Sequence, residues 1–202
     1  SKNWIAEMSK NFTLEKTIVL GYGKYIQTKG IVNLFVRFET LLTAIQYFGY
    51  AKLGAPYMAV GRNLAYTKSD FYTVKGFVNH MNIKSGDDDL FIQDAANNKN
   101  TTICISENSF TESEASTTLK ELFQQKRRHI STANHYKIQH KFFLGLFFIS
   151  KVTLLISAPI LLSFYSWKII LPILFSYYFV QYLVVGFSTK KLKEPQIIYF
   201  LP

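Results

Sequence analysis

The fold is decided by two apolar stretches, FFLGLFFISKVTLLISAPILLSFYSW at residues 142–167 and IILPILFSYYFVQYLVVGF at residues 169–187. A membrane-spanning helix needs about 20 mostly apolar residues. Both stretches meet that need, and Lys151 is the only charged residue within them. The sequence therefore predicts two transmembrane helices at residues 141–189, joined by a short turn at Lys168. Pro159 is expected to bend the first helix.

Basic residues gather at both outer ends of this hairpin. Those before it are Arg127, Arg128, Lys137 and Lys141, and those after it are Lys190, Lys191 and Lys193. Because loops rich in Lys and Arg stay on the cytoplasmic side, we predict a multi-pass protein of the cell (inner or plasma) membrane with residues 1–140 in the cytoplasm. Residues 190–202 are expected to form a cytoplasmic loop and the start of a further apolar segment. Lys151 either snorkels to the interface or faces a polar interior.

Composition bears on the possible partners and on cysteine chemistry. The net charge of +10 is explained first by the flanks of the hairpin, and no nucleic-acid-binding motif occurs, so nucleic acid is not an expected partner. Cys104 is the only cysteine, which excludes an intrachain disulfide. It lies in the β-branched run Thr101–Ile105, where an inert buried thiol is expected.

Residues 1–140 are predicted to form a mixed α/β region. Strands are expected at 17–20, 57–60, 64–66 and 101–105, and helices at 4–8, 31–50 and 87–96, with a further short helix capped by Ser69. The helix at 31–50 has a thin polar face, which fits partial burial and partial contact with a membrane interface. Thr118 and Glu121 form a capping box, which predicts a helix over 119–129.

Three adjacent carboxylates, Asp87, Asp88 and Asp89, begin the helix expected at 87–96. Adjacent carboxylates repel one another, so at least one should have a raised pKa. Such a group can accept a proton from a sugar hydroxyl as a general base. The alternative is a solvated acidic cap or a loose cation site. A metal motif of the form Asp-Asp-x-x-Asp is absent, because Phe91 and Ile92 stand where its last acid would be.

A basic run, Gln125-Lys126-Arg127-Arg128-His129, lies in the helix over 119–129. Gln125 and Arg128 share a face of that helix, while Lys126 points away from it. A guanidinium and an amide on one face suit a pyrophosphate. The alternative is a basic patch on anionic lipid headgroups. His129 either stacks under a sugar ring or sits at the interface.

A turn between two expected strands contains Arg62 and Asn63. These side chains either contact a ligand or, in the case of Asn63, serve the turn itself.

The order of these motifs resembles glycosyltransferase family 2, in its membrane-anchored, cellulose-synthase-like branch. The likeness covers nearly the whole chain and rests on Gly61-Arg62-Asn63-Leu64-Ala65-Tyr66, Gly76-Phe77, Gly86-Asp87-Asp88-Asp89-Leu90, Gln125-Lys126-Arg127-Arg128-His129 and the hairpin. The resemblance implies an α/β fold, the C-terminal part of a GT-A-type nucleotide-sugar transferase domain. Two departures stand out: Gly86 replaces a usual Glu, and His129 replaces a usual Trp.

The resemblance also implies a reaction and roles for particular residues. Asp87 would be the catalytic base of an inverting transfer from a nucleotide sugar to a lipid-linked or polysaccharide acceptor, with membrane lipid as a further partner. Gln125, Arg128 and His129 would contact the donor diphosphate and the acceptor. Arg62, Asn63, Asp88 and Asp89 would complete that site.

A divalent cation, Mg²⁺ or Mn²⁺, is expected for the full-length enzyme by the same resemblance. Its Asp-x-Asp ligands lie upstream in the family, and residues 1–86 contain no such motif. We therefore expect the chain to be a C-terminal fragment that is inactive alone and holds no metal site. Two alternatives remain at this point. One is a non-enzymatic two-span membrane protein with a cytoplasmic interaction domain, and the other is a lipid-phosphate transferase that binds Mg²⁺ through the Asp cluster.

Overall fold

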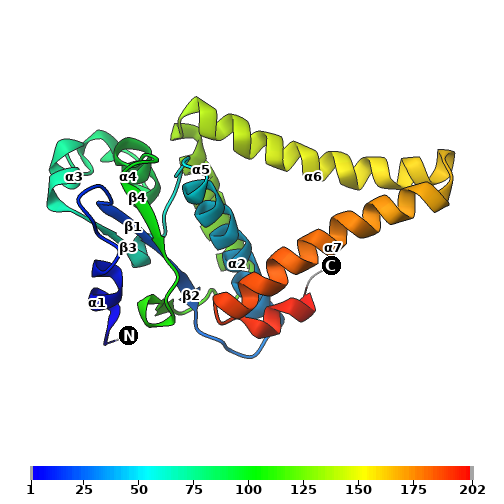
Figure 1. The fold of residues 1–202 in the computed structure, drawn as a ribbon, viewed down its shortest axis with the longest axis horizontal. Coiled ribbons are helices and arrows are strands. Elements are labelled where there is room, and N and C mark those ends of the chain that lie inside the picture. The colour runs from blue at the N-terminus through cyan, green and yellow to red at the C-terminus, as the bar shows by residue number, and fades with distance from the viewer. Residues whose placement is uncertain (1, 201–202) are drawn as a thin grey trace.

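A computed structural model describes residues 2–200 as a mixed helix and strand region with a long helical hairpin (Figure 1). The helices are α1 (Trp4–Ser9), α2 (Ile31–Lys52), α3 (Lys68–Thr73), α4 (Asp87–Ala95), α5 (Leu119–Thr132), α6 (Ile138–Phe164) and α7 (Trp167–Lys191). The strands are β1 (Ile18–Gly21), β2 (Gly23–Tyr25), β3 (Leu64–Tyr66), β4 (Thr101–Cys104) and β5 (Thr111–Ser113). Short 3-10 helices are η1 (Gly61–Asn63), η2 (Val78–His80), η3 (Glu107–Ser109), η4 (Ala133–His135) and η5 (Pro195–Phe200). The predicted mixture of helices and strands is confirmed.

The central sheet has the order β3-β1-β4, in which β1 is antiparallel to β3 and parallel to β4. A second, parallel pair joins β2 to β5. The strand predicted at residues 57–60 does not form, which corrects the sequence-based assignment. The carbonyl of Tyr57 accepts a hydrogen bond from Gln93 Nε2 of α4 at 2.7 Å instead of bonding to a neighbouring strand.

Helix α2 packs against this sheet and supplies much of the core. Its buried side chains include Leu41 and Tyr47, and the hydroxyl of Tyr47 donates a hydrogen bond to the carbonyl of Gly21 at 2.7 Å. At the start of the helix, Ile31 and Phe35 remain exposed. The partial burial expected for this helix is therefore present.

The predicted capping box is present at the start of α5. Thr118 Oγ1 accepts from the backbone N–H of Glu121 at 3.2 Å, and the Glu121 carboxylate accepts from the N–H of Thr118. The helix continues past His129 to Thr132. The cap expected at Ser69 is wrong by two residues, because Thr67 accepts the hydrogen bond that starts α3.

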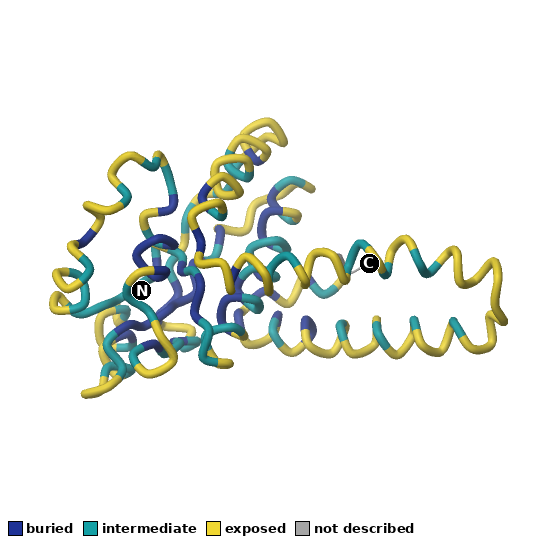
Figure 2. The backbone as a smooth tube through the Cα atoms, turned by 90° about the horizontal axis from the view of Figure 1, so that it is seen from above, coloured by how far each residue is buried: buried dark blue, intermediate teal, exposed yellow. Residues whose placement is uncertain are grey.

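Helices α6 and α7 are long and apolar enough to cross a membrane. They meet at a tip far from the sheet and separate toward the globular part, and most of their surface is exposed (Figures 1 and 2). The turn falls at Tyr165 and Ser166 instead of Lys168, because α7 begins at Trp167 with Ser166 as its N-cap. Between the helices, Lys151 Nζ donates to the hydroxyl of Tyr177 and to Gln181 Oε1. Lys151 thus faces a polar contact within the hairpin.

Both ends of the hairpin are attached to the globular part. At the start of α6, Gln93 Oε1 lies 2.9 Å from the ring Nδ1 of His140 and accepts from the backbone N–H of Lys137 at 2.9 Å. Beyond α7, Glu194 is buried and forms an ion pair with Arg37 of α2, with 3.0 Å between Arg37 Nε and Glu194 Oε2. Ile197 is also buried. The segment predicted as a cytoplasmic loop is therefore held against the globular part through Glu194 and Ile197, while Tyr199 is exposed.

Candidate functional site

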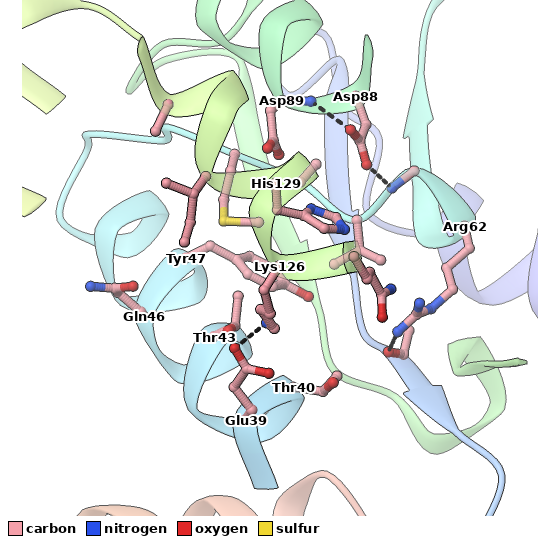
Figure 3. A pocket seen from close by; sticks show the side chains of 18 of the residues that line it. Glu39, Thr40, Thr43, Gln46, Tyr47, Arg62, Asp88, Asp89, Lys126 and His129 are labelled. Atoms are coloured by element: carbon pink, nitrogen blue, oxygen red, sulfur yellow. Dashed lines mark hydrogen bonds and ion pairs between the residues drawn. The ribbon is translucent and has the colours of Figure 1, made fainter. Parts of the chain in front are cut away.

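A cavity of about 600 Å³ lies where α2, η1, α4, α5 and α6 converge (Figure 3). The residues that line the cavity lie between Tyr22 and Leu144 in the sequence, so the fold brings distant segments together. Polar residues that line the cavity include Glu39, Thr40, Arg62, Asp88, Asp89, Gln125, Lys126, Arg128 and His129. Six of the eight residues selected from the sequence are among them.

The carboxylate of Asp88 is held by backbone groups at one end of the cavity. Its Oδ2 accepts from the N–H of Gly61 at 2.6 Å, and its Oδ1 accepts from the N–H of Asp89 at 2.9 Å. A side chain at Gly61 would crowd Asp88, because an added Cβ would lie 3.0 Å from Oδ2. The turn at residues 61–63 and the acidic start of α4 are therefore built to fit each other.

Gly86, which precedes the three carboxylates, has a structural reason to be glycine. Its φ is +83°, a left-handed conformation that favours glycine. An added Cβ would also lie 2.2 Å from Thr132 Cγ2 at the end of α5. The departure from the family pattern at this position thus allows α4 and α5 to approach closely.

Asp89 is the most deeply buried of the three carboxylates, with 4% of its surface exposed. Its Oδ2 accepts a hydrogen bond from the hydroxyl of Tyr136 at 2.7 Å, while Oδ1 has no partner among residues 2–200. Burial first, and the neighbouring charge of Asp88 second, raise the pKa of Asp89 to about 7. A carboxyl with this pKa can exchange a proton near neutral pH.

Two of the selected residues lie outside the cavity. Asp87 is exposed and is not among the lining residues. Asn63 is fully buried, and its amide Nδ2 donates to the carbonyls of Tyr22 and Ser109 while its Oδ1 accepts from the indole N–H of Trp4. The bonding capacity of Asn63 is thus used to hold its own turn against the sheet.

Arg62 is positioned by Tyr25 of β2. Its guanidinium carbon lies 4.2 Å from the centre of the Tyr25 ring, and it donates to the carbonyl of Gly23. Its Nε is buried and has no partner in the described part of the chain. Gln125 donates through Nε2 to the Tyr25 hydroxyl at 3.1 Å, which fixes the amide beside the same ring.

Arg128 lies at the junction of this cavity and a smaller one of about 410 Å³, because both are lined by Tyr25, Gln125 and Arg128. Its side chain is exposed and has no hydrogen bond or ion pair within residues 2–200. It is therefore a cation that can bind an anionic group without breaking an existing contact.

Lys126 and His129 complete the wall formed by α5. Lys126 was predicted to point away from the site, but it lines the cavity and pairs with Glu39 of α2, as Figure 3 shows. Burial first, and the charge of Lys126 second, lower the pKa of His129 below its usual range. His129 is therefore mainly neutral near pH 7 and presents an uncharged ring. No local motif marked Tyr25, Glu39 or Tyr136, since their roles depend on the packing of separate elements.

The divalent cation expected from the family resemblance has no ligand set in this part of the protein. Within residues 2–200, no group of three or more His, Cys, Asp or Glu side chains is placed to hold a metal ion. The described residues therefore do not fit the metal site that the resemblance implies.

Comparison with models of protein families gives no match for this chain, and comparisons with curated proteins and with solved structures give none either.

Proposed function

We propose that this chain is part of an inverting glycosyltransferase that moves a sugar from a nucleotide-sugar donor to a hydroxyl acceptor. One observation carries the proposal: a single cavity beside the membrane hairpin contains a carboxylate pair, Asp88 and Asp89, together with the unpaired guanidinium of Arg128. A base and a diphosphate-binding cation are the two groups that such a transfer needs. The mixed sheet is compatible with the C-terminal part of a GT-A-type domain.

In this mechanism, the Asp88–Asp89 pair takes the proton from the acceptor hydroxyl. These carboxylates replace Asp87 in the base role, because Asp87 is exposed and does not line the cavity. Asp89 has the basicity suited to neutral pH, and Asp88 is fixed by two backbone N–H groups beside it. The negative charge of Asp88 raises the pKa of Asp89 and so favours proton transfer to Asp89.

The deprotonated oxygen then attacks the anomeric carbon from the side opposite the leaving group. The bond between that carbon and the nucleoside diphosphate breaks, and the diphosphate leaves with the bonding electrons. Arg128 and Gln125 are the groups placed to bind its oxygens, because guanidinium donors form paired hydrogen bonds with phosphate. Arg62 also lines the cavity and adds a second positive charge to it.

The site is proposed to lie on the cytoplasmic side of the membrane. The basic residues Lys137 and Lys141 stand at the start of α6, and Lys190 and Lys191 stand at the end of α7. Because both ends of the hairpin carry positive charge, both favour the cytoplasmic side. The globular part connects to both ends and would lie there as well.

A sugar-transfer assay tests the proposal directly. The intact protein is purified in detergent and incubated with a panel of radiolabelled nucleotide sugars and a membrane-lipid extract. We expect transfer from at least one donor, and a loss of about 10²–10⁴-fold in the Asp88→Asn/Asp89→Asn double variant. The Asp87→Asn variant is the matched control and should retain most of the activity. Transfer by the double variant at the wild-type rate would refute the proposal.

A further inference from the structure

One end of the cavity is apolar, in contrast to the end that contains the charged groups. Met58, Ala133 and Leu144 line it and pack against the same core cluster, and Ile130 lines the cavity as well. Ile130 is 69% exposed although it lines the cavity, so it stands at the opening. Leu144 is contributed by α6, one of the two helices that are long and apolar enough to cross a membrane. The apolar end of the cavity therefore reaches the hairpin.

The position of Leu144 along α6 indicates how this end meets a bilayer. Lys141 lies one turn before it and donates through Nζ to the carbonyl of Asn134 at 2.6 Å, which holds the charge toward the globular part. Lysine at the end of a spanning helix marks the polar boundary of the membrane. Leu144 follows that boundary, among the exposed apolar residues at the start of α6, which include Phe142 and Phe143. The cavity thus extends from the aqueous side to the edge of the hydrocarbon.

The apolar end also lies next to the carboxylates. The backbone N–H of Ala59 lowers the pKa of Asp89 and so lies close to that carboxylate, and Met58 is the adjacent residue. Ala133 lies in η4, just before Tyr136, whose hydroxyl binds the same carboxylate. An anionic headgroup would be repelled by Asp88 and Asp89 here. An uncharged alcohol on an aliphatic chain satisfies both surroundings, because its hydroxyl can donate to a carboxylate while its chain contacts apolar side chains.

We propose that the acceptor is a membrane lipid with a free, uncharged hydroxyl head, which enters the cavity sideways from the bilayer past Leu144 and Ile130. This rests on the proposed function and specifies its acceptor. The hydroxyl loses its proton to the Asp88–Asp89 pair, its oxygen bonds to the anomeric carbon, and the nucleoside diphosphate departs with the electrons of the broken bond. The product is a glycolipid that leaves by the same lateral route.

Photolabelling in phospholipid nanodiscs tests this proposal. One probe is a diacylglycerol with a diazirine in its acyl chain, and the other is phosphatidylcholine with the same chain, whose head lacks a free hydroxyl. We expect the diacylglycerol probe to label peptides that contain Met58, Ile130 or Leu144 about tenfold more than phosphatidylcholine does. Leu144→Trp and Ile130→Trp should each reduce this labelling about tenfold, because the indole fills the opening.

The controls use neighbouring apolar residues on the same helices. Leu146→Trp and Phe123→Trp replace exposed residues that do not line the cavity, and labelling by either probe should be unchanged. Equal labelling by the two probes at the cavity peptides would show ordinary boundary lipid only and would overturn the proposal. Labelling that resists both Ile130→Trp and Leu144→Trp would overturn it as well.

Binding of uridine and guanosine diphosphates to the same preparation separates this proposal from the transferase assignment. Nucleotide binding without a preference for the hydroxyl lipid would support the transferase function but indicate a polymeric acceptor. That result would overturn the proposal of a lipid acceptor. Preferential lipid labelling without nucleotide binding would support the lipid site and count against the transferase.

Discussion

The hydroxyl of Tyr136 donates a hydrogen bond to Oδ2 of Asp89 at 2.7 Å, inside the core that joins α4 to the start of the hairpin. This bond favours the ionised carboxylate and so lowers the pKa of Asp89. Burial raises that pKa by more, and the net value is about 7. The balance between the two sets the pH at which the carboxylate can accept a proton.

The Tyr136→Phe variant should move the pH dependence of sugar transfer to higher pH. Removing the hydroxyl raises the pKa of Asp89 further, so less of the carboxylate is ionised near neutrality. We expect the rate at pH 6 to fall more than the rate at pH 8, which a pH–rate profile would reveal. Tyr72→Phe, at an exposed position, is the control. An unshifted profile would mean that Asp89 does not limit the reaction.

The stability of the protein should fall as pH rises from about 4 to about 7. The folded-state pKa of Asp89 is about 7, above its unfolded value of 3.8, so the folded state binds the extra proton between these values. This contribution is fully present below the unfolded pKa and is lost as pH rises through the folded pKa. Its size is on the order of a few kcal/mol. Thermal unfolding at several pH values measures it, and Asp89→Asn should flatten the trend.

The buried pair of Arg37 and Glu194 should show strong coupling. Glu194→Met or Arg37→Met alone leaves a buried charge without a partner and should destabilise the protein by about 3–5 kcal/mol. The double replacement should recover most of that loss, because no charge then remains. Denaturant unfolding in detergent provides the measurement. Glu107→Gln, which breaks an exposed pair with Lys193, should change stability by about 0–1 kcal/mol. Additive effects of the two single replacements would argue against the pairing.

Arg128→Ala should weaken the binding of nucleoside diphosphates by about tenfold or more, since a hydrogen bond to a charged group contributes about 1.5–3 kcal/mol. Arg127→Ala removes a neighbouring charge from an exposed position that lines neither cavity, and affinity should stay the same. Calorimetric titration of the intact protein compares the two. Equal losses in both variants would indicate a general effect of positive charge instead of a specific contact.

Local patterns in the sequence were sufficient for several elements. The apolar spacing of α2, the capping box at Thr118 and the length of the two apolar stretches each depend on neighbouring residues alone. Their predictions needed no knowledge of the rest of the fold. The strand expected at residues 57–60 failed for the opposite reason, because a strand depends on pairing with a distant segment, and here Gln93 of α4 bonds to the Tyr57 carbonyl instead.

The composition of the cavity was partly predictable. The motifs that contain Arg62, Asp88 and Arg128 were recognised, yet the sequence could not decide which of three adjacent carboxylates faces inward. Successive residues on a helix point about 100° apart, and the inward face of α4 is set by its packing against Tyr136 and the turn at Gly61. The pairing of Lys126 with Glu39 is likewise a contact between separate helices.

The attachment of the hairpin at both ends has a mechanical consequence. Gln93 bonds to the beginning of α6, and Arg37 bonds to Glu194 just beyond α7. Both helices of the hairpin are therefore tied to the globular part. In a membrane that α6 and α7 span, the two attachments would together fix the distance of Asp89 from the lipid surface. A thicker or thinner bilayer would then move the whole cavity relative to the membrane instead of changing the shape of the cavity.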